Sequence, residues 1–273
     1  MNNNEKPKRQ IIDLENPFGT ISPETALSLI TKFDITKFNT CNINYLTIYH
    51  YNSESINDSG WGCAWRSTQT SLHYALTKNK QININIPLKN LYNECHTQQQ
   101  VETLFCECYQ LKQAPQYIIE KDIAPETNKG WAEPFISKLI LHKYGIKGEL
   151  FLLNGYPLNA IAPENVFDKV LMYNEFEMFL EKHFQKENPS PIIIDDAQVS
   201  LIICGISKLK ENDGGYTLII IDPHVRNDPL KEAVYLAKID KEGNLNQSSN
   251  VELGVCLRFI TFNKKKWMIY VSD

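Results

Sequence analysis

The sequence predicts an α+β fold, and two observations support that prediction. In the first half of the chain, apolar residues recur at the spacing of a helix after Cys63 and again between Trp131 and Tyr144. From residue 191 onward, short runs rich in β-branched and aromatic residues are separated by turn residues, which is typical of strands. Because helices come first and a run of strands follows, we expect helices packed on an antiparallel sheet.

Local signals place the individual elements. Helices are expected to begin near Pro23, at Cys63 and at Trp131, where Pro134 suits a first turn and Gly145 a C-terminal cap. Two more helices are predicted over residues 101–109 and 176–184. Strands are predicted over residues 45–51, 148–153, 191–194, 199–206, 216–221, 233–239, 255–262 and 267–271.

The chain is expected to form one domain. No linker rich in Pro, Ser or Gly divides it, so residues 17–273 are assigned to a single domain that follows a flexible arm, residues 1–16. The 273 residues are 42% hydrophobic and carry a formal net charge of −4, which suits a globular protein with a buried core. No face is rich enough in Lys and Arg to indicate nucleic acid, and no apolar run reaches the roughly 20 residues of a membrane span.

The seven cysteines indicate a reducing compartment. They are odd in number, and no CxxC pair has a matching partner pair. The N-terminal stretch lacks the apolar core of a signal peptide. HExxH and paired Cys/His spacings are also missing, so we expect no metal ion and no cofactor. The cysteine pattern and the N-terminal stretch predict free thiols in a protein of the cytoplasm or the nucleus.

Cys63 is the first candidate for chemistry. Gly60 and Gly62 precede it and allow the chain to enter the following helix at a sharp angle. At a helix N-terminus, the dipole and free backbone N–H groups favour a thiolate, and the same N–H groups can point at a developing oxyanion. The alternative is a buried structural cysteine, which is the usual fate of a free thiol.

Asp222 and His224 form the second candidate group. They follow the apolar run 218–221, and positions i and i+2 of a strand point to the same side. A carboxylate beside an imidazole fixes its tautomer, and an imidazolium beside a thiolate is an activated nucleophile. An isolated Asp-x-His is otherwise common in surface turns, so the pair gains meaning only together with Cys63.

These residues resemble the ubiquitin-fold modifier-specific protease family. The resemblance is carried by Tyr49-His50-Tyr51, by the block from Asp58 to Ser67 (Asp-Ser-Gly-Trp-Gly-Cys-Ala-Trp-Arg-Ser) followed by Gln69-Thr70, and by Asp222-Pro223-His224. Trp131, which follows a glycine, resembles the central Trp helix of the family. The autophagin family, which shares Gly-Trp-Gly-Cys and a later Asp-Pro-His, is the nearest rival.

The resemblance implies a papain-like cysteine protease fold with the catalytic order Cys, Asp, His. Cys63 would be the nucleophile, His224 the general base and acid, and Asp222 its orienter, with Tyr51 as an oxyanion donor. Trp61 and Trp131 are candidate substrate-binding residues, Trp61 as a wall of the narrow channel that a glycine-ended tail needs. The implied partner is a ubiquitin-like modifier with its conjugates, cut after its C-terminal glycine, and ubiquitin-fold modifier 1 is favoured.

Three alternatives remain open from the sequence: a deubiquitinase, an autophagin-like protease, and a modifier-binding adaptor without turnover. Members of the modifier-specific protease family have a glycine-rich stretch before the strand that leads to Asp-Pro-His. This chain has Asp195-Asp196 in its place. The family's aromatic residue after Asp-Pro-His is replaced by Val225. Trp131 is followed by Ala132-Glu133-Pro134, which is closer to the autophagins.

Overall fold

The computed structural model describes residues 19–54, 56–80, 86–208, 215–225, 229–245, 262 and 265–273. The predicted arm of residues 1–16 lies outside these ranges, and so does nearly all of the strand predicted over 255–262.

Within these ranges, eight strands form one sheet in the order β3-β2-β8-β4-β5-β6-β7, with β1 added against β5. All neighbouring strands are antiparallel except β2 and β3, which run parallel. The strands are β1 (Asn39–Thr40), β2 (Gly148–Leu153), β3 (Lys169–Leu171), β4 (Ile192–Asp195), β5 (Ser200–Lys208), β6 (Tyr216–Ile221), β7 (Val234–Ile239) and β8 (Trp267–Ser272). The predicted α+β class with a largely antiparallel sheet is confirmed.

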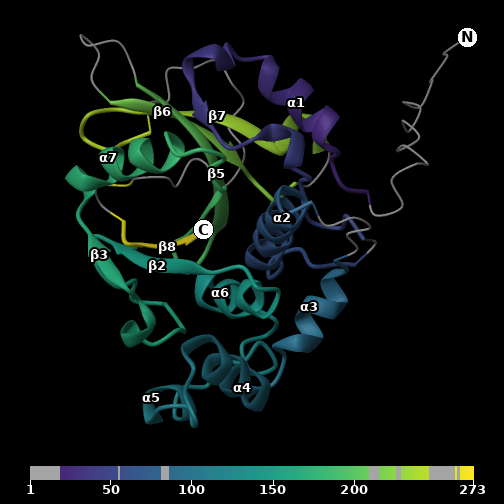
Figure 1. The fold of residues 1–273 in the computed structure, drawn as a ribbon, viewed down its shortest axis with the longest axis vertical. Helices are drawn as coiled ribbons and strands as arrows, with labels where there is room; N and C mark the ends of the chain where they lie inside the picture. Colours follow the sequence, from purple (N-terminus) through teal and green to yellow (C-terminus); the bar gives the residue numbers. More distant parts are fainter. Residues whose placement is uncertain are drawn as a thin grey trace, which may run out of the picture.

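Helices cover both faces of the sheet (Figure 1). They are α1 (Pro23–Thr31), α2 (Cys63–Lys78), α3 (Leu88–Glu94), α4 (Gln98–Tyr109), α5 (Gln116–Ile119), α6 (Pro134–Lys143), α7 (Tyr173–Phe184) and α8 (Pro229–Glu232). Short 3₁₀ turns span Ile35–Lys37, Ile43–Tyr45 and Glu164–Val166. None of the helices in the described ranges is long and apolar enough to cross a bilayer.

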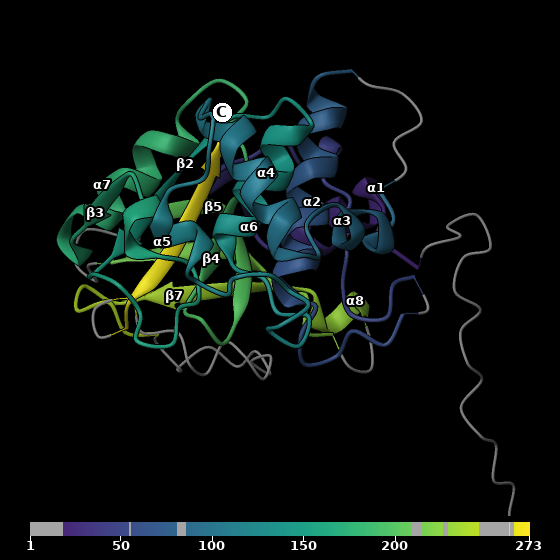
Figure 2. The same ribbon diagram turned by 90° about the horizontal axis from the view of Figure 1, so that it is seen from below.

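The core is divided by the sheet into two clusters. α1 and α7 pack on one face, where Ile192 and Ile194 of β4 are buried. α4, α6 and most of α2 pack on the other face, with Ile193 of β4. Alternation along a strand explains this division, and burial on both faces explains why β4 reads as a continuous apolar run. Figure 1 shows α4 and α5 outside α6, away from the sheet, and in the view from below these helices overlap the strands (Figure 2).

Two sequence predictions are wrong at the level of single elements. Residues 45–51 do not form a strand: a 3₁₀ turn ends at Tyr45, and only Ile48 bridges, to Ile21. The Tyr49 N–H donates instead to the Thr70 hydroxyl on α2 (3.0 Å), so this segment is held by individual bonds. The helix predicted from Trp131 begins at Pro134, because the proline holds the preceding Glu133 in an extended conformation (φ −128°, ψ 169°).

Gly205 of β5 pairs with Thr40 of β1, and the contact leaves little room for a side chain at this position. A Cβ at Gly205 would lie 2.7 Å from Cγ2 of Thr40 and 2.9 Å from the Asn39 carbonyl oxygen. Gly205→Ala is therefore expected to lower the free energy of unfolding by about 1–3 kcal/mol, the usual cost of overpacking, as measured by urea unfolding. Ser207→Ala on the same strand should change it by less than about 0.5 kcal/mol, and equal stabilities of the two variants would refute this packing argument.

Candidate functional site

Cys63 is the first residue of α2 and its side chain is buried, with 2% of the residue exposed. Gly60 adopts a positive φ of +91°, and a Cβ at Gly62 would overlap the carboxylate of Asp58. The two glycines therefore serve the sharp entry into the helix, as expected. The thiol lies at the N-terminal end of α2, where N–H groups of the first turn can point at an oxyanion that forms at Cys63.

Asp222 and His224 meet directly after β6. The Asp222 N–H donates to the Ala233 carbonyl oxygen (2.9 Å), which fixes the residue at the strand end. Oδ1 of Asp222 accepts from the backbone N–H of His224 (2.8 Å) and from its Nδ1 (2.6 Å). Because a carboxylate can only accept, Nδ1 carries a proton, and Nε2 of the neutral imidazole is left as the accepting nitrogen. The predicted pairing of the two side chains is present.

Tyr51 connects this pair to the cysteine. Its N–H donates to the Pro223 carbonyl oxygen (2.9 Å), and its ring packs edge-on against the His224 ring with centroids 5.1 Å apart. Its hydroxyl lies beside the Cys63 thiol. Burial and the neighbouring thiol raise the pKa of Tyr51 well above its usual value, so the phenol keeps its proton and can act as a donor. The structure thus brings together Cys63, Tyr51, Asp222 and His224.

A buried charge cluster that the sequence analysis missed holds the loop before α2. Nε of Arg66 donates to Oδ2 of Asp58 (2.6 Å), and its Nη1 donates to Oε2 of Glu54 (2.6 Å). Arg66 is fully buried, as is Asp58. Oδ1 of Asp58 also accepts from the N–H of Asn52 (2.8 Å), the residue after Tyr51. Arg66 therefore fixes Tyr51 and Cys63 relative to each other.

Glu54 extends the cluster to the next helix. Both of its carboxylate oxygens accept from the Leu88 N–H at the start of α3 (2.9 and 3.0 Å). Gln69, one turn after Arg66, joins the same group through Nη1 of Arg66 (2.8 Å). The available signal in the sequence was a single arginine on a helix that otherwise buries uncharged residues.

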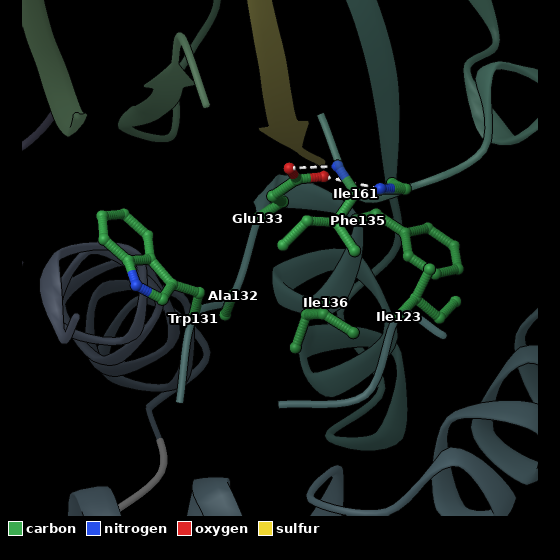
Figure 3. A pocket seen from close by; sticks show the side chains of 8 residues that line it. Ile123, Trp131, Ala132, Glu133, Phe135, Ile136 and Ile161 are labelled. Atoms are coloured by element: carbon green, nitrogen blue, oxygen red, sulfur yellow. Dashed lines mark hydrogen bonds between the residues drawn. The ribbon is translucent and has the colours of Figure 1, made fainter. Parts of the chain in front are cut away.

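Trp61 and the segment at Gly130 cover the beginning of α2. A Cβ at Gly130, which has a φ of +86°, would lie 2.9 Å from Cε3 of Trp61, and Nε1 of Trp65 donates to the Gly130 carbonyl oxygen (2.8 Å). Trp131 is half-buried and precedes α6, and its indole is turned away from Ile123 (Figure 3). Trp61 thus lies two residues before the nucleophile, while Trp131 follows the glycine that contacts Trp61, and the role of both in binding substrate stays a prediction.

The hollow drawn in Figure 3 is too small for a substrate. It measures about 10 Å³, room for about one water molecule, and Glu133 lines it. The Glu133 carboxylate accepts from the N–H groups of Ile161 (2.6 Å) and Ala162 (2.8 Å), while burial raises its pKa to about 7. Its visible role is to tie the start of α6 to the loop at residues 161–162. Among the residues that the structure describes, no cluster of His, Cys, Asp and Glu is arranged to hold a metal ion.

Comparison with known proteins finds a family that the segment around the predicted nucleophile resembles. The family model described as Peptidase family C78 matches residues 36–118, which include Tyr51, Cys63 and Arg66. The matched stretch is less than half of the chain and contains the predicted nucleophile. The family resemblance stated from the sequence, to the ubiquitin-fold modifier-specific proteases, is confirmed. Asp222 and His224 lie beyond the matched residues.

A solved structure supports the same fold for the rest of the C78-like chain. The crystal structure of UfSP from C. elegans matches 92% of this chain with a TM-score of 0.50 and 15% sequence identity. This likeness confirms the papain-like fold that was expected. The chain spans 37% of the length of that UfSP chain. No curated protein matches.

Removing Arg66 should be far more damaging than removing an exposed cation. Arg66→Met would leave the carboxylates of Asp58 and Glu54 buried without their partner, so we expect the free energy of unfolding to fall by about 3–5 kcal/mol. Lys37→Met is the matched control, because Lys37 pairs with Asp34 on the surface and its loss should leave the free energy of unfolding almost unchanged. Chemical unfolding measures both, and a small loss for Arg66→Met would contradict the role given to the cluster.

Proposed function

We propose that the protein is a thiol protease that cleaves after the C-terminal glycine of a ubiquitin-like modifier, with ubiquitin-fold modifier 1 favoured. The observation that carries the proposal is the meeting of Cys63, Tyr51 and the Asp222–His224 pair in one buried site. The match of the nucleophile segment to Peptidase family C78 supports it. The reaction would serve precursor maturation, deconjugation of the modifier from lysine side chains, or both.

The geometry suits acyl transfer through a thioester. The Cys63 thiolate attacks the carbonyl carbon of the terminal glycine, and the oxyanion that forms accepts from the Tyr51 hydroxyl and the Cys63 N–H. His224 imidazolium gives its proton to the leaving amine as the C–N bond breaks. A water molecule, deprotonated by His224, then attacks the thioester and releases the modifier carboxylate and the thiol. Asp222 holds the imidazole in the required tautomer throughout.

The proposal also includes the cellular location of the protein and the kind of partner that it binds. Six cysteines in the described ranges are free thiols, which supports a reducing compartment and hence the cytoplasm, with the nucleus as a second location. The formal net charge of −4 supports a protein partner over nucleic acid. No finding supports the deubiquitinase, autophagin-like or adaptor alternatives.

Cleavage of modifier–reporter fusions tests the activity. With ubiquitin-fold modifier 1, ubiquitin and an autophagy modifier as parallel substrates, we expect the first to be cut fastest, and no cleavage by Cys63→Ala or His224→Ala. Tyr51→Phe should lower kcat by about 10²–10³-fold with little change in KM, because it removes an oxyanion donor.

Tyr49→Phe is the matched control for Tyr51→Phe. The Tyr49 hydroxyl bonds to Nδ1 of His73 (2.9 Å), so its loss should leave kcat within a few fold of wild type. Equal kcat values for the two variants would remove Tyr51 from the mechanism. Faster cleavage of ubiquitin than of ubiquitin-fold modifier 1 would replace the favoured substrate.

A further inference from the structure

A second cavity lies at the C-terminal end of α6. It measures about 220 Å³ and is bounded by the last residues of α4, which packs against α6 (Figure 1). Lys138 and His142 of α6 line it, together with Lys147, which directly precedes β2. The segment that covers the start of α2 precedes the opposite end of α6, so this cavity is separate from the Cys63 site.

The lining of this cavity is basic, although the chain carries a formal net charge of −4. Among the described residues that line it, two are lysines, one is a histidine, and none is an aspartate or a glutamate. The carbonyl oxygens of residues 140–142, at the end of α6, accept from the N–H groups of residues 144–146 that cap the helix. They are therefore already satisfied, and the basic side chains favour an anion in the cavity.

Lys138 is a buried cation that is held in place. Its side chain is 9% exposed, Nζ donates to Oδ2 of Asp168 (3.1 Å), and the ammonium lies 4.7 Å from the centroid of the Tyr109 ring. The Asp168 carboxylate, which also accepts from the Leu150 N–H (2.8 Å), favours the charged form of this lysine. That bond uses one of the three N–H groups of the ammonium, which leaves others for a ligand. Asp168 offsets one positive charge, and Lys147 supplies the excess.

Tyr270 of β8 brings a second, independent feature to the wall of the cavity. Its hydroxyl is enclosed and forms no hydrogen bond with any residue that the structure describes. A Cβ at Gly148 would lie 2.5 Å from this hydroxyl, so the phenol lies against a lining residue that has no side chain. A buried tyrosine hydroxyl normally has a partner, and a ligand in the cavity that accepts from Tyr270 would supply it.

We propose that this cavity binds a small phosphate-type oxyanion, with Lys138 and Lys147 offsetting its charge and His142 and Tyr270 donating hydrogen bonds. The inference goes beyond the proposed function and does not depend on it. Ammonium groups are point charges that bind phosphate oxygens from several directions, whereas a planar carboxylate is matched best by an arginine fork, which this lining lacks. The volume is below the roughly 300–1,000 Å³ of sites for drug-sized ligands, so the ligand is small.

Isothermal titration calorimetry of the full-length chain with inorganic phosphate tests the proposal. We expect saturable binding at one site per chain. Lys147→Met should weaken the affinity about tenfold, because it removes a charged donor from an exposed position where the fold does not need it. Tyr270→Phe should weaken the affinity several-fold, and because the hydroxyl has no partner in the described protein, this variant should be as stable as the wild type.

Two matched variants control for nonspecific effects of losing a lysine or a buried phenol. Lys182→Met removes an exposed lysine from α7, which packs on the other face of the sheet. Tyr216→Phe removes an enclosed hydroxyl from the core cluster of that other face. Neither change should alter the affinity for phosphate.

Parallel titrations with glycerol phosphate and with acetate identify the ligand class. Tighter binding of glycerol phosphate than of inorganic phosphate would assign the site to a phosphate monoester, and the reverse order would assign it to the free ion. The proposal is overturned if neither phosphate compound shows saturable binding, or if acetate binds as tightly as phosphate. It is also overturned if Lys147→Met and Tyr270→Phe bind phosphate as tightly as Lys182→Met and Tyr216→Phe.

Discussion

The buried pair of Arg66 and Asp58 is the interaction on which the site depends. Asp58 lies in the loop that joins Tyr51 to Cys63, and besides its side-chain bonds, its carbonyl oxygen accepts from the N–H of Gly62 (2.8 Å). One residue therefore fixes both ends of the loop. Burying two charges costs desolvation energy that their attraction only partly returns, so the pair contributes defined geometry more than net stability.

The geometry it defines explains how two distant parts of the chain make one site. α2 brings the thiol, the loop before it brings the Tyr51 phenol, and the end of β6 brings the carboxylate–imidazole pair. β6 lies between β5 and β7 within the sheet, so the loop that follows it starts from a rigid position. The bond from the Tyr51 N–H to the Pro223 carbonyl oxygen then joins that loop to the segment before the helix. Precise placement of this kind is what acyl transfer requires.

Much of this could be predicted from the sequence, because the signals were local. The helix from Cys63 follows from apolar periodicity, and the pairing of Asp222 with His224 follows from their spacing. Strands β2 and β4 to β8 follow from runs rich in β-branched and aromatic residues, whereas the three-residue strand β3 is too short to give such a signal. The strand predicted over 45–51 is wrong although the composition of the segment is typical of a strand. Its backbone groups bond to a side chain and to isolated backbone groups and not to a neighbouring strand. The Arg66 cluster was missed because its partners stand 8 and 12 residues away in a loop, where no periodicity signals contact.

The central claim, that Cys63 is a nucleophile served by His224 toward a modifier tail, is tested most directly by covalent capture. Ubiquitin-fold modifier 1 carrying a C-terminal electrophile is incubated with the protein, and the modified peptide is identified by mass. The account predicts one adduct, on Cys63, that is absent in Cys63→Ala and strongly reduced in His224→Ala. An adduct on another cysteine, or equal capture by wild type and His224→Ala, would contradict it.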